Sequence, residues 1–363
     1  MKQKIKTALF IGVILGAGLS TPLQATTAKK TEQQSSKHAA APVSKNKHVV
    51  NKSTGKIATK NTLEKPATAG YKAPVKSAKA SSKSGKTVHA AVDTAKKPIR
   101  RVTYNDIDPN RLALFSASAL VIDQNTGQSL LEKHSDVVVP IASISKLMTA
   151  MVVLDAHLDM HEVISIGEEE VDHLKGTRSR IPVGTTMTRE AAMLLSLMSS
   201  ENRAAHALGR HYPGGMRAFV AAMNRKALSL GMTRSNFEEP TGLSSNNVST
   251  AKDLARMVAA AARYPEIRGY STTAEAKLEL NGQIREFHNT NALVRSDNWE
   301  IGVSKTGYIS EAGRCLVMQA RVADKPVVIV LLDSAGKMTR VGDANRIKRW
   351  MESASLASDR RPV

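Results

Sequence analysis

Apolar residues along the chain follow two different spacings, one typical of strands and one typical of helices. Small and β-branched residues flank the turn sequence Asn125-Thr126-Gly127, which predicts a hairpin of strands over residues 114–123 and 128–133. From about residue 141 to 262 the apolar residues recur at helical spacing. The predicted helices cover residues 189–197, 204–212, 216–230 and 250–264.

Two of these helices carry specific signals at their ends. Gly231 directly follows the third helix, where a glycine commonly ends a helix in the left-handed conformation. Thr250 and Asp253 form a variant of the capping box at the start of the fourth helix. The boundaries of both helices are therefore predicted by local chemistry as well as by spacing.

Strands return in the last quarter of the chain. Their spacing predicts an antiparallel meander, with turns at 311–313 and 323–326, followed by a last helix over 339–352. The three predicted strands cover residues 299–308, 314–322 and 327–333. Because the first hairpin finds partners only here, we expect an α+β (mixed α/β) fold: one antiparallel sheet built from both chain ends, with a helical subdomain inserted between its strands.

The first 25 residues have the composition of a secretory signal peptide. Three lysines precede an apolar stretch over residues 8–19, and small residues follow. The apolar stretch is short for a membrane span, so cleavage near Ala25 or Ala28 is expected, with an uncleaved anchor as the alternative. The mature protein is then expected in the periplasm, without a transmembrane anchor.

Residues 26–105 are predicted to be a basic, disordered linker. Within 26–103, eighteen Lys or Arg residues stand against three acids, a net charge of +15, and large apolar side chains are nearly absent. Such a segment buries too little surface to offset the entropy of ordering it. In an exported protein its partners would be anionic envelope polymers or lipids and not nucleic acid, unless it is only a spacer. One folded domain over 106–355 and a short tail over 356–363 follow.

Three short polar motifs occur in the folded domain: Ser143-Ile144-Ser145-Lys146, Ser200-Glu201-Asn202 and Lys305-Thr306-Gly307. Each alone has a simple structural explanation, respectively a helix cap beside a solvated lysine, a helix N-cap, and an exposed strand end. Together and in this order they are the signature of penicillin-binding proteins and class A β-lactamases. The first motif also opens an apolar run at helical spacing, which predicts Ser143 and Lys146 on one helix face.

On these motifs the sequence resembles the serine-type D-Ala-D-Ala peptidase (penicillin-binding protein) family over about residues 108–352. Within it the chain is similar to D-alanyl-D-alanine endopeptidases of the penicillin-binding protein 7 type, including the stretches 199–205 and Pro240-Thr241-Gly242-Leu243-Ser244. The resemblance implies a β-lactamase/transpeptidase-like fold. Carboxypeptidase relatives often add a C-terminal β domain and an anchor, whereas this chain stops at Val363, which favours the shorter endopeptidase branch.

The chemistry of the first motif can be argued from its residues. Ser143 would attack an amide carbonyl, but a hydroxyl is a poor nucleophile until a base takes its proton. Lys146 is placed to be that general base, provided that burial and neighbouring cations lower its pKa. The resemblance implies the remaining roles: Lys305 as a cation across the cleft, Ser200 as a proton relay to the leaving amine, and Asn202 as a support for the substrate amide and the lysine.

The resemblance also implies contacts between the substrate and a strand edge. Thr306 and Gly307 would lie along this edge, where glycine permits close approach of another backbone. The backbone N–H groups of Ser143 and Tyr308 would form the oxyanion hole, and such donors typically contribute about 3–4 kcal/mol each. No cofactor and no metal is expected at this site.

Other residues that invite a functional role have simpler explanations. Cys315, the single cysteine, lies in an apolar run and is expected to be a buried hydrophobe. Arg178 and Arg180 flank a loop and would either meet a substrate carboxylate or lie exposed. Four histidines lack a metal-binding arrangement and are expected at the surface. They are His157, His161, His206 and His211.

The favoured function is thus an exported peptidoglycan D,D-endopeptidase that acts through a serine acyl-enzyme and is inhibited covalently by β-lactams. A D-alanyl-D-alanine carboxypeptidase is the nearest alternative. A class A-like β-lactamase is disfavoured, because Glu238 and Glu239 lack the Asn that follows the deacylating Glu four residues later in such enzymes. A catalytically silent wall-binding module is disfavoured by the intact motifs.

Overall fold

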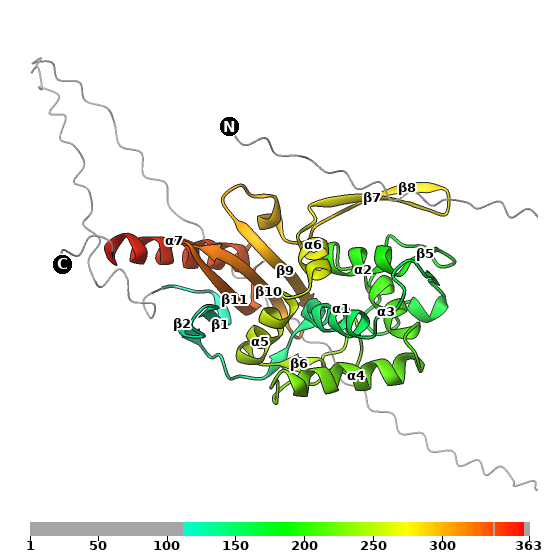
Figure 1. Ribbon diagram of the computed structural model, residues 1–363, viewed down its shortest axis with the longest axis horizontal. Coiled ribbons are helices and arrows are strands. Elements are labelled where there is room, and N and C mark those ends of the chain that lie inside the picture. Colours follow the sequence, from blue (N-terminus) through cyan, green and yellow to red (C-terminus); the bar gives the residue numbers. More distant parts are fainter. Residues whose placement is uncertain (1–111, 337, 359–363) are drawn as a thin grey trace, which may run out of the picture. The chain divides into compact units, whose positions relative to one another are not determined.

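The computed structural model describes residues 112–336 and 338–358, all of which belong to one compact unit. The predicted signal peptide and the basic linker lie outside the described residues. Figure 1 shows a central sheet in this unit, with most of the helices gathered on one side of it.

The central sheet is antiparallel and takes its strands from both ends of the folded region, as predicted. Its strand order is β2-β1-β11-β10-β9 (Figure 1). Pairing of Leu120 with Val330 joins the first strand to the last. The strands are β1 (Ser116–Asp123), β2 (Ser129–Lys133), β9 (Glu300–Ile309), β10 (Gly313–Val322) and β11 (Lys325–Ser334).

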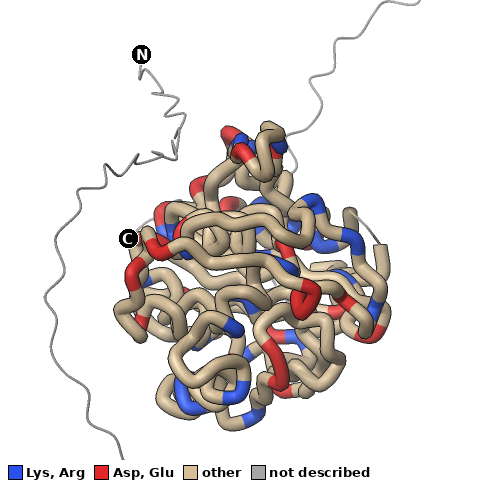
Figure 2. The backbone as a smooth tube through the Cα atoms, turned by 90° about the vertical axis from the view of Figure 1, so that its right-hand side faces the viewer, with Lys and Arg blue, Asp and Glu red and all other residues tan. Residues whose placement is uncertain are grey.

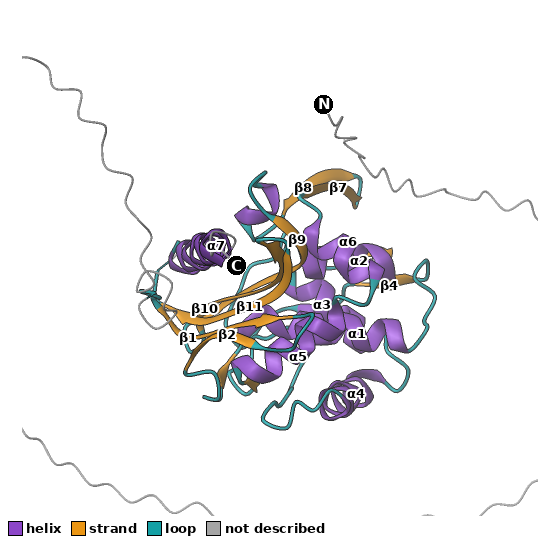
Figure 3. Ribbon diagram, turned by 60° about the vertical axis from the view of Figure 1, so that its left-hand side comes forward, coloured by secondary structure: helices purple, strands orange, loops and turns teal. Residues whose placement is uncertain are grey.

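Helices cover both faces of the sheet. Six helices form a layer on one face, and α7 (Thr339–Ser358) lies on the other (Figure 3). The larger layer contains α1 (Lys146–Asp155), α2 (Arg189–Met198), α3 (Asn202–Arg210), α4 (Gly215–Ser229), α5 (Ala251–Ala261) and α6 (Pro265–Thr272). The last helix extends six residues beyond its predicted end at 352.

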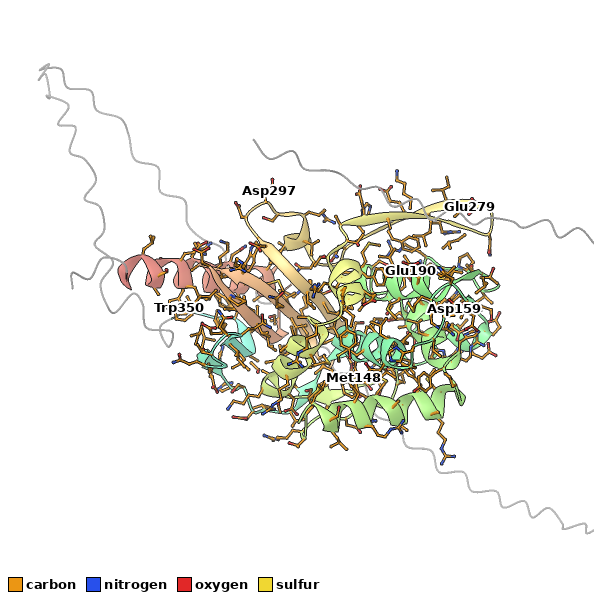
Figure 4. All side chains as sticks on the ribbon, in the orientation of Figure 1. Met148, Asp159, Glu190, Glu279, Asp297 and Trp350 are labelled. Carbon is orange, nitrogen blue, oxygen red and sulfur yellow. The ribbon has the colours of Figure 1, made fainter. Side chains whose placement is uncertain are left out.

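The alternation of side chains along the strands explains this layering. On β10, Val317 packs into the core of the six-helix layer, whereas Leu316 packs with Ile347 of α7. In Figure 4, Met148 lies in the six-helix layer and Trp350 on α7. Because successive side chains of a strand point to opposite faces, a sheet that is covered twice needs apolar residues at nearly every position.

The predicted helix signals are present in the structure. The Thr250 side chain accepts a hydrogen bond from the backbone N–H of Asp253 at 3.1 Å, and Gly231 has a φ of 72°. The turn before β11 is tighter than predicted. Only Ala323 and Asp324 form it, both with positive φ, so that β11 begins at Lys325. Such two-residue turns match the twist of the strands that they join.

Several short elements were not predicted from the spacing. The hairpin of β7 (Glu275–Leu280) and β8 (Gln283–His288) projects from the six-helix side, and its strands bury few side chains (Figure 1). Charged and apolar residues alternate along β7, which is a strand signal that the prediction overlooked, and Leu280 and Phe287 of the hairpin join the core of the six-helix layer. Two shorter ladders pair segments within the helical layer. They join β3 (Val139–Pro140) to β6 (Val248–Ser249) and β4 (Val163–Ser165) to β5 (Thr186–Thr188).

Charge is balanced in the folded part of the chain. Acidic and basic residues are interspersed along the backbone of the domain (Figure 2). Residues 104–363 contain 31 Lys or Arg and 29 Asp or Glu, so the net charge of +20 belongs almost entirely to the preceding segments. No helix within residues 112–336 and 338–358 is long and apolar enough to cross a membrane.

Candidate active site

Ser143 lies at the junction of the sheet and the six-helix layer, in the 3₁₀ turn Ala142–Ser145 that directly precedes α1. Lys146 is the first residue of α1. The expectation of one shared helix is therefore wrong in detail, although the two side chains do meet, with Lys146 Nζ 2.9 Å from Ser143 Oγ. Ser143 caps no helix and Lys146 is 0% exposed, which excludes the explanation of a cap beside a solvated lysine.

Two glycines allow neighbouring backbone to pack directly against the Ser143 turn. A Cβ atom at Gly307 on β9 would lie 3.0 Å from the Ile141 carbonyl oxygen and 3.1 Å from the Ser143 nitrogen. At Gly242, whose φ is +81°, a Cβ atom would lie only 2.0 Å from the Ala142 carbonyl oxygen. The glycine of the third motif is thus required by its contact with the first motif.

Lys146 is buried with three oxygen atoms around its amine. Nζ lies 2.7 Å from Asn202 Oδ1 and 2.6 Å from the Thr241 carbonyl oxygen, in addition to its contact with Ser143. Burial lowers the pKa of Lys146 to about 7, while the charges of Glu239 and Glu201 oppose this shift. The predicted lowering of the pKa is present, but its main cause is loss of solvation and not a neighbouring cation.

The second motif supplies one partner to each lysine of the site. Ser200 has a φ of 63°, in the left-handed region, and its Oγ lies 2.8 Å from Lys305 Nζ. Helix α3 begins at Asn202, its N-cap residue is Glu201, and no side chain caps it. The interpretation of this motif as a simple helix N-cap is therefore wrong. Backbone strain at a non-glycine residue of this kind is frequently found at functional sites.

Glu201 anchors the second motif to a neighbouring loop. Its carboxylate accepts hydrogen bonds from Ser179 Oγ at 2.7 Å and Arg180 Nε at 2.9 Å. The Arg180 guanidinium also lies over the Phe287 ring, 4.6 Å from its centroid. Arg180 thus holds the loop although its side chain is 45% exposed, and Arg178 is exposed too.

Lys305 is buried on β9, the outermost strand of the sheet. Besides Ser200, its amine contacts the Thr306 carbonyl oxygen at 3.0 Å. Burial first, and then the charges of Lys146 and Arg340, lower the pKa of Lys305 well below its usual value. The explanation of this motif as an exposed strand end is wrong, and the expectation of a permanent cation at Lys305 conflicts with this environment.

The remaining residues of the third motif face different surroundings. Thr306 Oγ1 lies 2.8 Å from Thr290 Oγ1 and is buried, whereas Tyr308 is 57% exposed. The Arg314 guanidinium stacks on the Tyr308 ring, 4.4 Å from its centroid. Arg340 of α7 donates to the Gly307 carbonyl oxygen at 3.0 Å, through a contact that no sequence motif indicated.

The loop that supplies the Thr241 carbonyl is held by side chains that the motifs did not reveal. Glu239 accepts hydrogen bonds from the backbone N–H groups of Thr241 and Gly242. Asn247 Nδ2 donates to Ser145 Oγ at 3.0 Å and to the Glu239 carbonyl oxygen at 2.8 Å. Glu239 thus shapes the loop. Every residue has a backbone carbonyl, so the sequence alone does not show that Thr241 is an acceptor. The only indication was the resemblance of the stretch around it to the family.

The side chains of the other predicted candidates form no hydrogen bond with the motif residues. Cys315 is buried, which raises the pKa of its thiol to about 11 and leaves it unreactive, as expected. His157 and His161 are exposed, while His206 contacts Glu170 at 2.9 Å. Among the described residues, one trio has metal-ligand geometry, and it contains none of the motif residues. It consists of Glu275, Glu286 and His288 on the exposed β7–β8 hairpin.

A serine in contact with a buried lysine, beside a second serine–lysine pair, is an arrangement that suits a serine peptidase. The family of D-alanyl-D-alanine carboxypeptidases, peptidase family S11, matches residues 105–336, and the chain belongs to this family. The protein is therefore a hydrolase of the penicillin-binding D,D-peptidase class.

Relatives of known name agree with this assignment. A D-alanyl-D-alanine endopeptidase of Pseudomonas aeruginosa is 48% identical over 252 residues, which cover 69% of this chain and 81% of that protein. A D-alanyl-D-alanine endopeptidase of Escherichia coli is 47% identical over 245 residues, which cover 67% of this chain and 79% of that protein.

Solved structures agree on the fold. The Streptomyces K15 DD-transpeptidase matches with a TM-score of 0.62 at 26% identity, over 66% of this chain and 98% of that one. A D-alanyl-D-alanine carboxypeptidase of Mycobacterium tuberculosis matches with a TM-score of 0.60 at 26% identity, over 66% of this chain and 91% of that one. The predicted β-lactamase/transpeptidase-like fold is thus confirmed.

Proposed function

We propose that this protein is an exported D,D-endopeptidase that hydrolyses D-Ala-linked cross-link bonds of peptidoglycan through an acyl-enzyme on Ser143. The single observation that carries the proposal is the contact of 2.9 Å between Ser143 Oγ and the buried amine of Lys146. The names of the two relatives at 48% and 47% identity support the endopeptidase assignment. Export rests on the N-terminal sequence alone.

The environment of Lys146 suits a neutral amine. A neutral amine has two N–H donors and one lone pair, and the two donors have acceptors in Asn202 Oδ1 and the Thr241 carbonyl oxygen. The lone pair is then left to accept the proton of the Ser143 hydroxyl. Burial favours this neutral form by removing the solvation of the ammonium ion. Lys146 thereby acts as the general base.

The second pair serves the leaving group. As Ser143 Oγ bonds to the carbonyl carbon, the C–N bond breaks and the departing amine needs a proton. Ser200 is placed to relay one, since its hydroxyl contacts Lys305 at 2.8 Å. Water then cleaves the resulting ester, releases a carboxylic acid and restores Ser143. The backbone N–H groups of Ser143 and Tyr308 would bind the oxyanion in both steps, each worth about 3–4 kcal/mol.

The substrate peptide would lie beside Thr306 and Gly307, because β9 is the outer strand of the sheet and has one unpaired edge. Peptides bind such edges through main-chain hydrogen bonds. Asn202 would then support both the substrate amide and Lys146. The same chemistry with free D-alanine as the leaving group is the carboxypeptidase reaction, so product analysis separates the two activities.

β-Lactams should trap the protein as a stable acyl-enzyme. Hydrolysis of that adduct in class A enzymes needs a carboxylate that activates water. Here the Glu239 carboxylate is occupied by the backbone N–H groups of Thr241 and Gly242, and that of Glu238 by the Ser244 hydroxyl. Glu239 is thus committed to the loop, and neither carboxylate forms a hydrogen bond with Ser143.

Labelling with a fluorescent penicillin tests the proposal. Wild-type protein should form a stable adduct that mass spectrometry places on Ser143. Ser143→Ala should form none, whereas Ser310→Ala, which alters an exposed serine beyond β9, should label normally. Purified cross-linked muropeptide dimers should yield monomers with the wild type and Ser310→Ala, and not with Ser143→Ala. An adduct on another residue, or equal labelling of Ser143→Ala, would refute the acyl-serine assignment.

A further inference from the structure

A short loop beside the second motif is folded around the carboxylate of Asp172. Asp172 Oδ1 accepts hydrogen bonds from the backbone N–H groups of Leu174 and Lys175, both at 2.9 Å. Its Oδ2 accepts from Thr177 twice, from the backbone N–H at 2.9 Å and from the hydroxyl at 2.6 Å. The loop therefore presents the Thr177 hydroxyl in a fixed direction.

The Thr177 hydroxyl also contacts the active site. Asn202 Nδ2 donates to Thr177 Oγ1 at 3.1 Å, while Asn202 Oδ1 faces Lys146 Nζ at 2.7 Å. A continuous path of hydrogen bonds thus runs from Asp172 through Thr177 and Asn202 to the lysine that contacts Ser143.

The direction of each bond in this path follows from the chemistry of its members. Burial raises the pKa of Asp172, but the hydrogen bonds from Thr177 and the backbone outweigh it and lower that pKa below its usual value. An ionised carboxylate only accepts, so the single hydroxyl proton of Thr177 points to Asp172. Toward Asn202 the hydroxyl can then only accept, which requires the NH₂ end of the amide.

We propose that Thr177, held by Asp172, is a positioning residue that orients the Asn202 amide so that its oxygen faces Lys146. The two ends of an amide have nearly the same shape, so packing does not distinguish them. With the amide reversed, its NH₂ group would donate to the lone pair of Lys146. That would divert the base from the Ser143 hydroxyl and leave one lysine N–H without its acceptor. This inference rests on the function proposed above.

The loop has a second attachment that serves as a control. Lys175 forms an ion pair with Glu311, in the turn that follows β9, and both side chains are partly exposed. Exposed ion pairs of this kind contribute little to stability. Lys175→Ala therefore removes an anchor of the loop without touching the hydrogen bond between Thr177 and Asn202.

Thr177→Val tests the proposal, because valine keeps the shape of threonine and removes the hydroxyl, and Thr177 is exposed enough to tolerate the change. The rate of acylation by a fluorescent penicillin should fall about tenfold, which is less than the roughly 10²–10⁴-fold that a general base contributes, because Lys146 is misdirected and not removed. Thr177→Ser, which restores the hydroxyl, and Lys175→Ala should both stay within about twofold of the wild type.

The pH dependence separates orientation from a general loss of structure. The oxygen of Asn202 stabilises the ammonium form of Lys146, so losing it should lower the pKa of Lys146. The acid limb of the rate profile should then move to lower pH in Thr177→Val, and not in Lys175→Ala. A disturbed loop alone would lower the rate without moving this limb.

The proposal fails if Thr177→Val keeps the wild-type rate and acid limb, or if Thr177→Ser is equally impaired. If thermal melting shows that Thr177→Val does not fold, the variant Asp172→Asn tests the proposal instead. Its amide would donate to Thr177, turn the hydroxyl proton toward Asn202 and slow acylation, and a wild-type rate would overturn the proposal. Failure of the proposed function is a separate outcome, visible as unlabelled wild type or labelled Ser143→Ala.

Discussion

Lowering the pH should suppress acylation of Ser143, because the proposed base, Lys146, has a pKa near neutrality. Burial lowers the pKa of Lys146 from its ordinary value of 10.5 to about 7. At about pH 7 an ordinary lysine is neutral in roughly 3 of 10,000 molecules, whereas here about half are neutral. The buried position thus raises the population of active base by about three orders of magnitude.

The sign and size of the pH effect follow directly. A base must be unprotonated, so the rate should rise with pH and reach a plateau above the pKa. Between about pH 8 and pH 6 the neutral fraction of Lys146 falls from about 0.9 to 0.1, so the rate should fall about tenfold. The assay is the second-order rate of labelling by a fluorescent penicillin under conditions where the fold is intact.

A histidine is the obvious alternative source of such a limb, because histidines titrate in the same range. His206 lies one helical turn after Asn202 on α3, so His206→Gln is the matched control. Its profile should keep the wild-type midpoint. A flat profile across this range, or a limb that disappears in His206→Gln, would refute the assignment of Lys146 as the base.

Three further predictions follow from the site and the sequence. Lys146→Arg should abolish labelling although charge is kept, because arginine stays protonated; labelling at the wild-type rate would mean that the base is misassigned. Gly242→Ala should abolish labelling, since its Cβ atom would lie 2.0 Å from the Ala142 carbonyl oxygen. Gly127→Ala, with a φ of +72° but open space around it, should cost only about 1–2 kcal/mol of stability in thermal melts and label normally; equal labelling by the two variants would contradict this. Deleting residues 26–103 should leave hydrolysis of soluble muropeptides unchanged but weaken binding to sacculi, steeply with salt, because exposed charges are screened beyond about 8 Å at physiological ionic strength. Equal binding of the full and truncated proteins at low salt would show that the segment is only a spacer.

The sequence alone determined the main helices, the five strands of the central sheet and the architecture of this protein, but not α6 or the short strands β3 to β8. Apolar spacing, the turn at Asn125-Thr126-Gly127 and the helix signals at Thr250 and Gly231 are local features, and local features are read from neighbouring residues. The sheet made from both chain ends followed from strands that lack partners nearby. The three motifs indicated the candidate reactive side chains, because acyl transfer restricts which residue types can serve as nucleophile and base.

Only the tertiary structure decided how these side chains behave. Burial of Lys146 sets its pKa, and burial depends on residues distant in the chain that enclose it. The Thr241 carbonyl and the Thr177 hydroxyl complete the surroundings of Lys146 and Asn202, yet a backbone oxygen and an exposed threonine have no distinctive sequence pattern. The same holds for Arg180, which was expected either to meet a substrate carboxylate or to lie exposed, and which binds the carboxylate of Glu201. A sequence lists the donors and acceptors of a protein, whereas their pairing is a property of distances that only the folded chain creates.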